Sequence, residues 1–97
     1  MSPAAKSESR VRKPLTLTFR CPGARSVALV GEFNDWNESA HPMKHDPDLD
    51  AWTITFEIPP DRYEYKFLVN DREWWNDQNT PKVPNVWGSE NSYLEVT

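Results

Sequence analysis

Apolar and polar residues alternate with a period of two along most of this chain, and that alternation constrains its fold more than any other feature. Successive side chains of a β-strand point to opposite faces, so a strand with one buried face has this period. The stretches "LTLTFR" (15–20), "AWTITFEIP" (51–59), "RYEYKFLVN" (62–70) and "SYLEVT" (92–97) all follow it. "VALVG" (27–31) is a continuous apolar run, typical of a central strand. No segment keeps a helical period over three turns, so the sequence predicts an all-β protein.

Turn signals separate these strands. They lie at residues 21–23, 41–50, 59–61 and 70–72 and around Pro81 and Pro84. Six or seven short strands in about 85 residues favour an immunoglobulin-like antiparallel β-sandwich, with a small closed barrel as the alternative. The 97 residues suffice for one small core. We expect a flexible polar tail over residues 1–14 and a single β-sandwich domain over residues 15–97.

Charge and cysteine content limit the partners and the cellular compartment that the sequence predicts. Residues 1–14 carry a net charge of +3, and the rest of the chain carries −7. Phosphate binding needs a basic surface, so the acidic body argues against a nucleic-acid partner. Cys21 is the only cysteine, and no stretch has the hydrophobicity of a membrane span or a signal peptide. The sequence therefore predicts a cytoplasmic protein without a membrane partner.

Signatures of catalysis and metal binding are scarce. The chain has no nucleophile elbow, zinc-protease motif or glycine-rich phosphate loop. His41 and His45 are four residues apart, but Pro42 disfavours a helix there, so we interpret both as loop histidines. Asp46, Asp48 and Asp50 have the spacing of a calcium loop, yet Ala51 stands where that loop needs glycine. We expect a solvated turn there, and neither an enzyme nor a metal or cofactor site.

Tryptophans in polar surroundings are the remaining candidates for function. Trp52 fits the buried phase of its strand, whereas four others lie in "FNDWNES", "REWWND" and "NVWGSEN". Trp74 and Trp75 are adjacent and must face opposite sides of a strand. Several exposed indoles in a small domain form an apolar patch, which normally marks a binding site. An indole can stack on the C–H face of a pyranose while Asn, Ser and Lys bind its hydroxyl rim. Closure of the ends of the sandwich and protein binding remain alternatives.

Five motifs together resemble the family 48 carbohydrate-binding modules. In order they are "VALVGEFNDW", "AWTITFEIPP", "YEYKFLVND", "EWWND" and "WGSENSYLEV", and the match runs from about Leu15 to the C-terminus. Its most specific parts are G-x-F-N-x-W at residues 31–36 and Y-x-Y-K-F at residues 63–67. The family includes the glycogen-binding domain of the AMP-activated kinase beta subunit and the early-set domains of isoamylases and branching enzymes. The resemblance implies the early-set, immunoglobulin-like sandwich.

The resemblance also implies a ligand and a set of binding residues. The ligand is an α-1,4-glucan, as a polysaccharide such as glycogen or starch or as a maltooligosaccharide, and a glucan-metabolising enzyme is a further partner. The residues that match the binding positions of the family are Trp36, Lys66, Trp74, Trp87, Ser89 and Asn91. The "NDRE" hairpin is longer than the usual D-G turn, so Trp75 is an alternative to Trp74. Some relatives attached to enzymes do not bind sugar, which makes a protein-interaction module the rival function.

Overall fold

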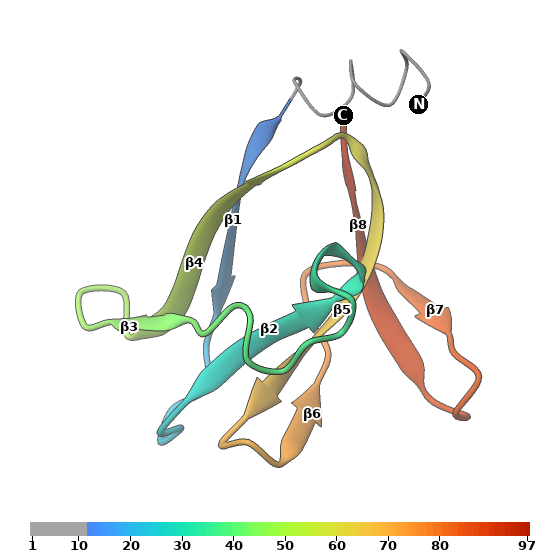
Figure 1. Ribbon diagram of the computed structural model, residues 1–97. Helices are drawn as coiled ribbons and strands as arrows, with labels where there is room; N and C mark the ends of the chain where they lie inside the picture. The colour runs from blue at the N-terminus through green and yellow to red at the C-terminus, as the bar shows by residue number, and fades with distance from the viewer. Residues whose placement is uncertain (1–11) are drawn as a thin grey trace.

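The computed structural model describes residues 12–97, which form two antiparallel sheets packed as a β-sandwich (Figure 1). One sheet has the strand order β1-β4-β3 and the other β2-β5-β8-β7, with β6 paired to β5. Within these residues one 3-10 turn, η1 (Glu32–Asn34), follows β2. The strands are β1 (Lys13–Phe19), β2 (Val27–Gly31), β3 (Lys44–Asp46), β4 (Ala51–Ile58), β5 (Asp61–Val69), β6 (Glu73–Trp75), β7 (Lys82–Pro84) and β8 (Glu90–Val96). The predicted all-β sandwich is confirmed, and the closed barrel is wrong.

The core between the sheets follows the predicted strand phases. Leu17 and Phe19 of β1 meet Leu29 of β2 and Tyr65 and Phe67 of β5 in one buried cluster. The rings of Phe19 and Phe67 stack with their centroids 4.3 Å apart. Large aromatic rings thus supply much of the core of a short chain, because each buries more apolar surface than an aliphatic side chain does.

Strand β5 is the centre of the larger sheet. Its first half pairs with β8, and its second half pairs with β2 on one edge and with β6 on the other. In Figure 1 it descends from the apex, where β4 crosses from the smaller sheet, and passes between β2 and β8. Residues of β5 therefore face the core and the outer surface of the sheet in alternation. Those on the outer surface have β2 on one side and β6 or β8 on the other.

Hydrogen bonds to Tyr65 and Ser92 fix the segment between β6 and β7. The Tyr65 hydroxyl donates to Asp77 Oδ2 at 2.7 Å, and the Asp77 N–H donates to Ser92 Oγ at 2.7 Å. Ser92 Oγ in turn donates to Asn76 Oδ1 at 3.0 Å. Burial, together with the neighbouring Asp77 carboxylate, raises the pKa of Tyr65 well above its ordinary range. The phenol therefore stays a neutral donor, and this buried network holds β6 and β7 in place beside β8.

Four details differ from the sequence predictions. Residues 44–46 and 82–84, both within predicted turns, form the short strands β3 and β7, giving eight strands instead of six or seven. His45 therefore lies in a strand and not in a loop. Strand β1 begins at Lys13, so Lys13 and Pro14, assigned above to the tail, pair with Ile58 and Glu57 of β4. Residues 1–11 lie outside the described part, and within residues 12–97 no helix has the length and apolarity of a membrane span.

Candidate binding site

A groove of about 1200 Å³ lies over the outer face of the larger sheet. The side chains on this face of β5 alternate with the buried Tyr65 and Phe67, as the phase of "YEYKFLVN" predicts. All six residues predicted for the site line the groove: Trp36, Lys66, Trp74, Trp87, Ser89 and Asn91. They come from the turn after η1, from β5 and β6, and from the β7–β8 hairpin. The fold thus brings into one place residues that are up to 55 positions apart in the chain.

Apolar residues form a second layer on this outer face. Val30 is completely buried and Leu68 nearly so, although neither belongs to the core cluster between the sheets. Val30 pairs with Lys66 across β2 and β5, and Leu68 pairs with Trp74 across β5 and β6. Residues directly opposite each other on antiparallel strands share a face, so Val30 and Leu68 are neighbours of the groove residues. The groove therefore rests on a close-packed base.

Polar side chains along the groove form a connected network. Lys66 Nζ donates to Ser89 Oγ at 3.3 Å, and Asn85 Nδ2 donates to the same oxygen at 2.9 Å and to Asn91 Oδ1 at 3.0 Å. Asn91 Nδ2 donates to Glu64 Oε1 at 3.1 Å. Each group is held by its neighbour, so the donors and acceptors that remain are fixed in direction. Such an array suits a ligand that carries many hydroxyl groups.

Trp36 is presented by a turn that departs from ordinary backbone geometry. Asp35 and Trp36 both adopt left-handed conformations, with φ of 56° and 59°. The Trp36 N–H donates to Gly31 O at 2.8 Å, which closes the turn. Gly31 is needed where β2 ends, because a Cβ there would lie 2.5 Å from Glu64 O and 2.7 Å from Tyr65 Cβ. We call residues 31–37 the Trp36 turn.

Trp87 lies in a loop organised by one asparagine. Asn85 Oδ1 accepts the N–H groups of Trp87 at 2.9 Å and of Ser89 at 3.2 Å. Gly88 has φ of 81°, a left-handed conformation that favours glycine. Val86 and Trp87 are 90 % and 87 % exposed. We call residues 85–89 the Trp87 loop, and its apolar side chains extend into solvent beside the groove.

The register of β6 distinguishes Trp74 from Trp75. Trp74 lies opposite Leu68, on the outer face, and lines the groove, whereas Trp75 lies opposite Phe67, on the other face. Trp75 Nε1 donates to Glu73 Oε1 at 3.3 Å. The two indoles are nearly equally exposed, at 46 % and 42 %, so they differ in the face they occupy and not in accessibility.

Sequence reasoning missed several residues of the groove. Pro84, Asn85 and Val86 line it, and so do three carboxylates, those of Glu32, Glu38 and Glu64. A signal existed for two of them. Glu64 lies two residues before Lys66 and so shares its face, and "NVWG" is typical of an Asx turn that begins at Asn85. The positions of Glu32 and Glu38 depend on the conformation of the Trp36 turn, which the sequence pattern does not give.

Comparison with known families now adds to this geometry. Residues 13–97 match the family described as the glycogen recognition site of AMP-activated protein kinase. The chain belongs to this family. The resemblance to family 48 carbohydrate-binding modules is thereby confirmed over residues 13–97.

Curated relatives of this chain fall into two groups. The beta-1 subunit of 5'-AMP-activated protein kinase from Sus scrofa is 30 % identical over 74 residues, which cover 76 % of this chain and 57 % of that subunit. The 1,4-alpha-glucan-branching enzyme of Candida glabrata is 44 % identical over 59 residues, covering 52 % of this chain and 8 % of the enzyme. The 1,4-alpha-glucan branching enzyme GlgB of Novosphingobium aromaticivorans is 38 % identical over 48 residues, covering 50 % and 7 %. The chain thus spans between 7 % and 57 % of these relatives.

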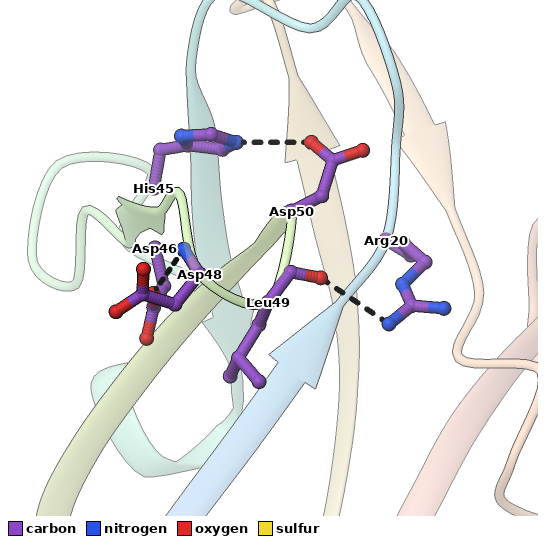
Figure 2. A network of polar contacts seen from close by, with 6 residues as sticks. All are labelled: Arg20, His45, Asp46, Asp48, Leu49 and Asp50. Atoms are coloured by element: carbon purple, nitrogen blue, oxygen red, sulfur yellow. Dashed lines mark hydrogen bonds and ion pairs between the residues drawn. The ribbon is translucent and has the colours of Figure 1, made fainter.

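Away from the groove, an acidic turn joins β3 to β4 (Figure 2). Asp46 Oδ1 accepts the Asp48 N–H at 2.9 Å, and Asp50 Oδ1 lies 3.4 Å from His45 Nε2. Arg20 donates to Leu49 O at 3.2 Å, which ties the turn to the end of β1. Within residues 12–97 no three His, Cys, Asp or Glu side chains are placed to share a metal ion. The geometry of this turn is explained by contacts within the chain.

Proposed function

We propose that this domain binds chains of α-1,4-linked glucose, of the glycogen, starch or maltooligosaccharide type, in the groove and without catalysing a reaction on them. One observation carries the proposal. Trp36, Trp74 and Trp87 converge on a single groove together with the polar network of Lys66, Ser89 and Asn91. Membership of the glycogen recognition family and similarity to a kinase subunit and to branching enzymes support carbohydrate as the ligand.

The family match, which names glycogen, favours α-linked over β-linked glucan, and the placement of the Trp36 turn and the Trp87 loop is compatible with such a chain. The Trp36 turn follows β2 and the Trp87 loop joins β7 to β8, so these elements lie on either side of β5 in the sheet order. An α-1,4 chain curves along its length, whereas a β-1,4 chain is a straight ribbon. A curved chain can contact both sides of such a groove at once, with successive rings against different indoles.

The charge of the site favours a neutral ligand. The groove is lined by the carboxylates of Glu32, Glu38 and Glu64 and by the single ammonium group of Lys66. An excess of negative charge repels phosphate and nucleic acid, but carboxylates accept hydrogen bonds readily from sugar hydroxyls. A neutral polyol is therefore the ligand class that best fits both the indoles and the charge.

Affinity should be modest. Stacking one sugar face on an indole removes about 50 Å² of apolar surface and contributes on the order of 1 kcal/mol. Three such contacts and a few hydrogen bonds, less the cost of ordering the sugar, correspond to a dissociation constant of roughly micromolar to millimolar. We further propose that the protein acts in the cytoplasm, a setting that its single cysteine, Cys21, fits.

Isothermal titration with maltoheptaose tests the proposal, and the β-linked oligosaccharide cellohexaose is the control ligand. We expect binding of maltoheptaose only, weakened roughly fivefold or more by Trp36→Ala because one stacking surface is lost. Absence of binding at millimolar maltoheptaose, or unchanged affinity in Trp36→Ala, contradicts the proposal. Release of reducing ends from starch by the pure protein would contradict its non-catalytic part.

The predicted rival, a protein-interaction module, has one observation in its favour. Val86 and Trp87 are almost fully exposed, which is unusual for large apolar side chains in a small domain. Co-purification of a partner from cell extract, with and without added maltoheptaose, separates the two functions. Capture that needs no glucan and resists its addition favours the rival, and capture through added glycogen alone favours sugar binding.

A further inference from the structure

The Trp36 turn needs an anchor, because its backbone is unfavourable for the residues it contains. Asp35 and Trp36 have left-handed conformations that place the Cβ of an L-residue close to its own carbonyl oxygen. Such a conformation persists only where surrounding contacts determine it. Trp36 itself is 39 % exposed, so its own packing is incomplete. The contacts that hold the turn must come from its neighbours.

The side-chain amide of Asn34 is that anchor. Its Oδ1 accepts the Gly31 N–H at 3.1 Å, and its Nδ2 donates to Leu29 O at 3.0 Å. These two contacts fix the orientation of the amide. In the flipped amide the NH₂ group would face the Gly31 N–H, and the oxygen would face the Leu29 carbonyl oxygen. The Asn34 NH₂ group has a second hydrogen, and His41 Nδ1 lies 2.8 Å from the same nitrogen. His41 is therefore the acceptor in this contact.

His41 is itself held in place from two sides. Its carbonyl oxygen accepts the Leu29 N–H at 2.9 Å, which aligns its backbone with the edge of β2. Its ring lies against Phe56 of β4, with centroids 4.6 Å apart, and meets Phe33 of η1 edge-on at 6.1 Å. A ring fixed in this way cannot turn freely. To accept from Asn34 at Nδ1, it must be neutral, with its proton on Nε2.

We propose that neutral His41 is a positioning residue, which holds Asn34 and thereby the Trp36 turn in the conformation that presents Trp36 to the groove. Its effect on glucan affinity rests on the proposed function, whereas its effect on the turn does not. Protonation of His41 places a ring N–H against the Asn34 NH₂ group, and two donors at hydrogen-bond distance repel. The acidic form of the protein therefore loses one of the three contacts of the Asn34 amide.

The surroundings of His41 set the direction of the pH dependence. Burial lowers the pKa of His41 below its ordinary value of 6.5. The ring lines a second hollow together with Arg12 before β1, Glu32 of η1, Glu57 of β4 and Tyr63 of β5. Arg12 is occupied by the Glu57 carbonyl, to which it donates at 3.3 Å. The contact with Asn34 is thus complete above pH 6.5 and is lost as the pH falls through the lower pKa of the folded protein.

Maltoheptaose affinity tests the role when it is measured at about pH 8 and at a pH about one unit below the titration midpoint of the His41 ring, since the ring changes charge between them. We expect a loss of about three- to tenfold at the acidic pH in the native protein, the worth of one hydrogen bond. His41→Gln offers a carbonyl acceptor that does not titrate, so it should bind with little pH dependence. His41→Phe fills the ring's place without an acceptor and should bind weakly at both pH values.

The second histidine provides the matched control. His45 lies in β3 beside Asp50, in the turn shown in Figure 2, away from the residues that line the groove. His45→Gln should therefore keep the full pH dependence of the native protein. Equal affinity of the native protein at the two pH values, or a pH dependence that persists in His41→Gln, overturns the proposal.

A sugar-free measurement separates this proposal from the proposed function. Nitrogen-15 chemical shifts of the His41 ring should report the Nε2–H tautomer at neutral pH, and the Trp36 amide signal should shift with the same midpoint as the ring. A Trp36 signal that ignores the titration of His41 contradicts the positioning role. If maltoheptaose fails to bind at any pH, the proposed function fails, and this nuclear magnetic resonance titration still decides whether His41 holds the turn.

Discussion

The Trp36 turn and the Trp87 loop bring aromatic rings to one groove from either side of β5, and each is organised by one asparagine. The Asn34 amide bonds to Leu29 and Gly31 of β2 and to His41, so the Trp36 turn is attached to the body of the sandwich. The Asn85 side chain bonds mostly within its own loop, to Trp87 and Ser89. The Trp36 turn and the Trp87 loop, which we call the two walls of the groove, therefore differ: the first is attached to the body of the sandwich, and the second is held mostly by its own contacts.

Packing strengthens the difference. Phe33, within the Trp36 turn, contacts the rings of Phe56, Tyr63 and Tyr65. Val86 and Trp87 lie almost entirely in solvent. Segments with few buried apolar contacts open at low free-energy cost, whereas segments packed on a core do not. We infer that the Trp36 turn is a preformed wall of the groove and that the Trp87 loop can adjust its rings to a ligand.

The largest expected effect comes from the glycines of the two walls. Gly31→Ala places a Cβ 2.5 Å from the Glu64 backbone oxygen, whereas a Cβ at Gly88 meets no atom within 4 Å and suffers only from its positive φ. Overpacking of about 1–3 kcal/mol should lower the melting temperature of Gly31→Ala by roughly 5–20 °C. Gly88→Ala should cost about 1 kcal/mol. Circular dichroism during thermal unfolding measures the loss of stability in both variants. A larger loss in Gly88→Ala than in Gly31→Ala would contradict a rigid Trp36 turn beside an adjustable Trp87 loop.

The two asparagines give the second contrast between the walls of the groove. Asn34→Ala leaves the Gly31 N–H and the Leu29 carbonyl without their partner, so we expect a loss of about 1–3 kcal/mol in the free energy of unfolding and roughly tenfold in maltoheptaose affinity. Asn85→Ala frees a loop that is already exposed. It should leave the unfolding free energy nearly unchanged and weaken binding only about two- to fivefold, through the cost of ordering the loop.

Urea unfolding measures the stability of the two variants, and calorimetric titration measures their affinity for maltoheptaose. Equal losses of stability in Asn34→Ala and Asn85→Ala would mean that the Trp87 loop is as firmly attached as the Trp36 turn. A binding loss confined to Asn85→Ala would mean that the loop, and not the turn, dominates recognition.

Much of the fold was predictable, because strand phase is a local property. The alternation in "YEYKF" places Tyr65 and Phe67 in the core and Lys66 outside, and burial confirms it. Strands β3 and β7 were not predictable. Each has three residues, and proline and aspartate surround them, so only pairing with β4 and β8 makes them strands. Their formation depends on tertiary contacts that short-range patterns do not contain.

The binding site, like the fold, was predictable only in part. The family resemblance predicted six of the residues that line the groove, and strand phase agreed for Lys66 and Asn91, but neither decided between Trp74 and Trp75. The register that places Trp74 opposite Leu68 is a property of two strands and not of "EWW" alone. The contact between Asn34 and His41 joins two irregular segments with no period to reveal it. Functional geometry that depends on such turns must be read from the structure.

The two neighbouring indoles of β6 give the most direct test of the central claim that the outer face of the larger sheet binds glucan. Trp74→Ala and Trp75→Ala remove equally exposed rings from adjacent positions on opposite faces. Calorimetric titration with maltoheptaose should reveal a roughly fivefold loss of affinity in Trp74→Ala, equivalent to about 1 kcal/mol of stacking, and a change of less than about twofold in Trp75→Ala. Equal losses in both variants, or a loss only in Trp75→Ala, would contradict the account.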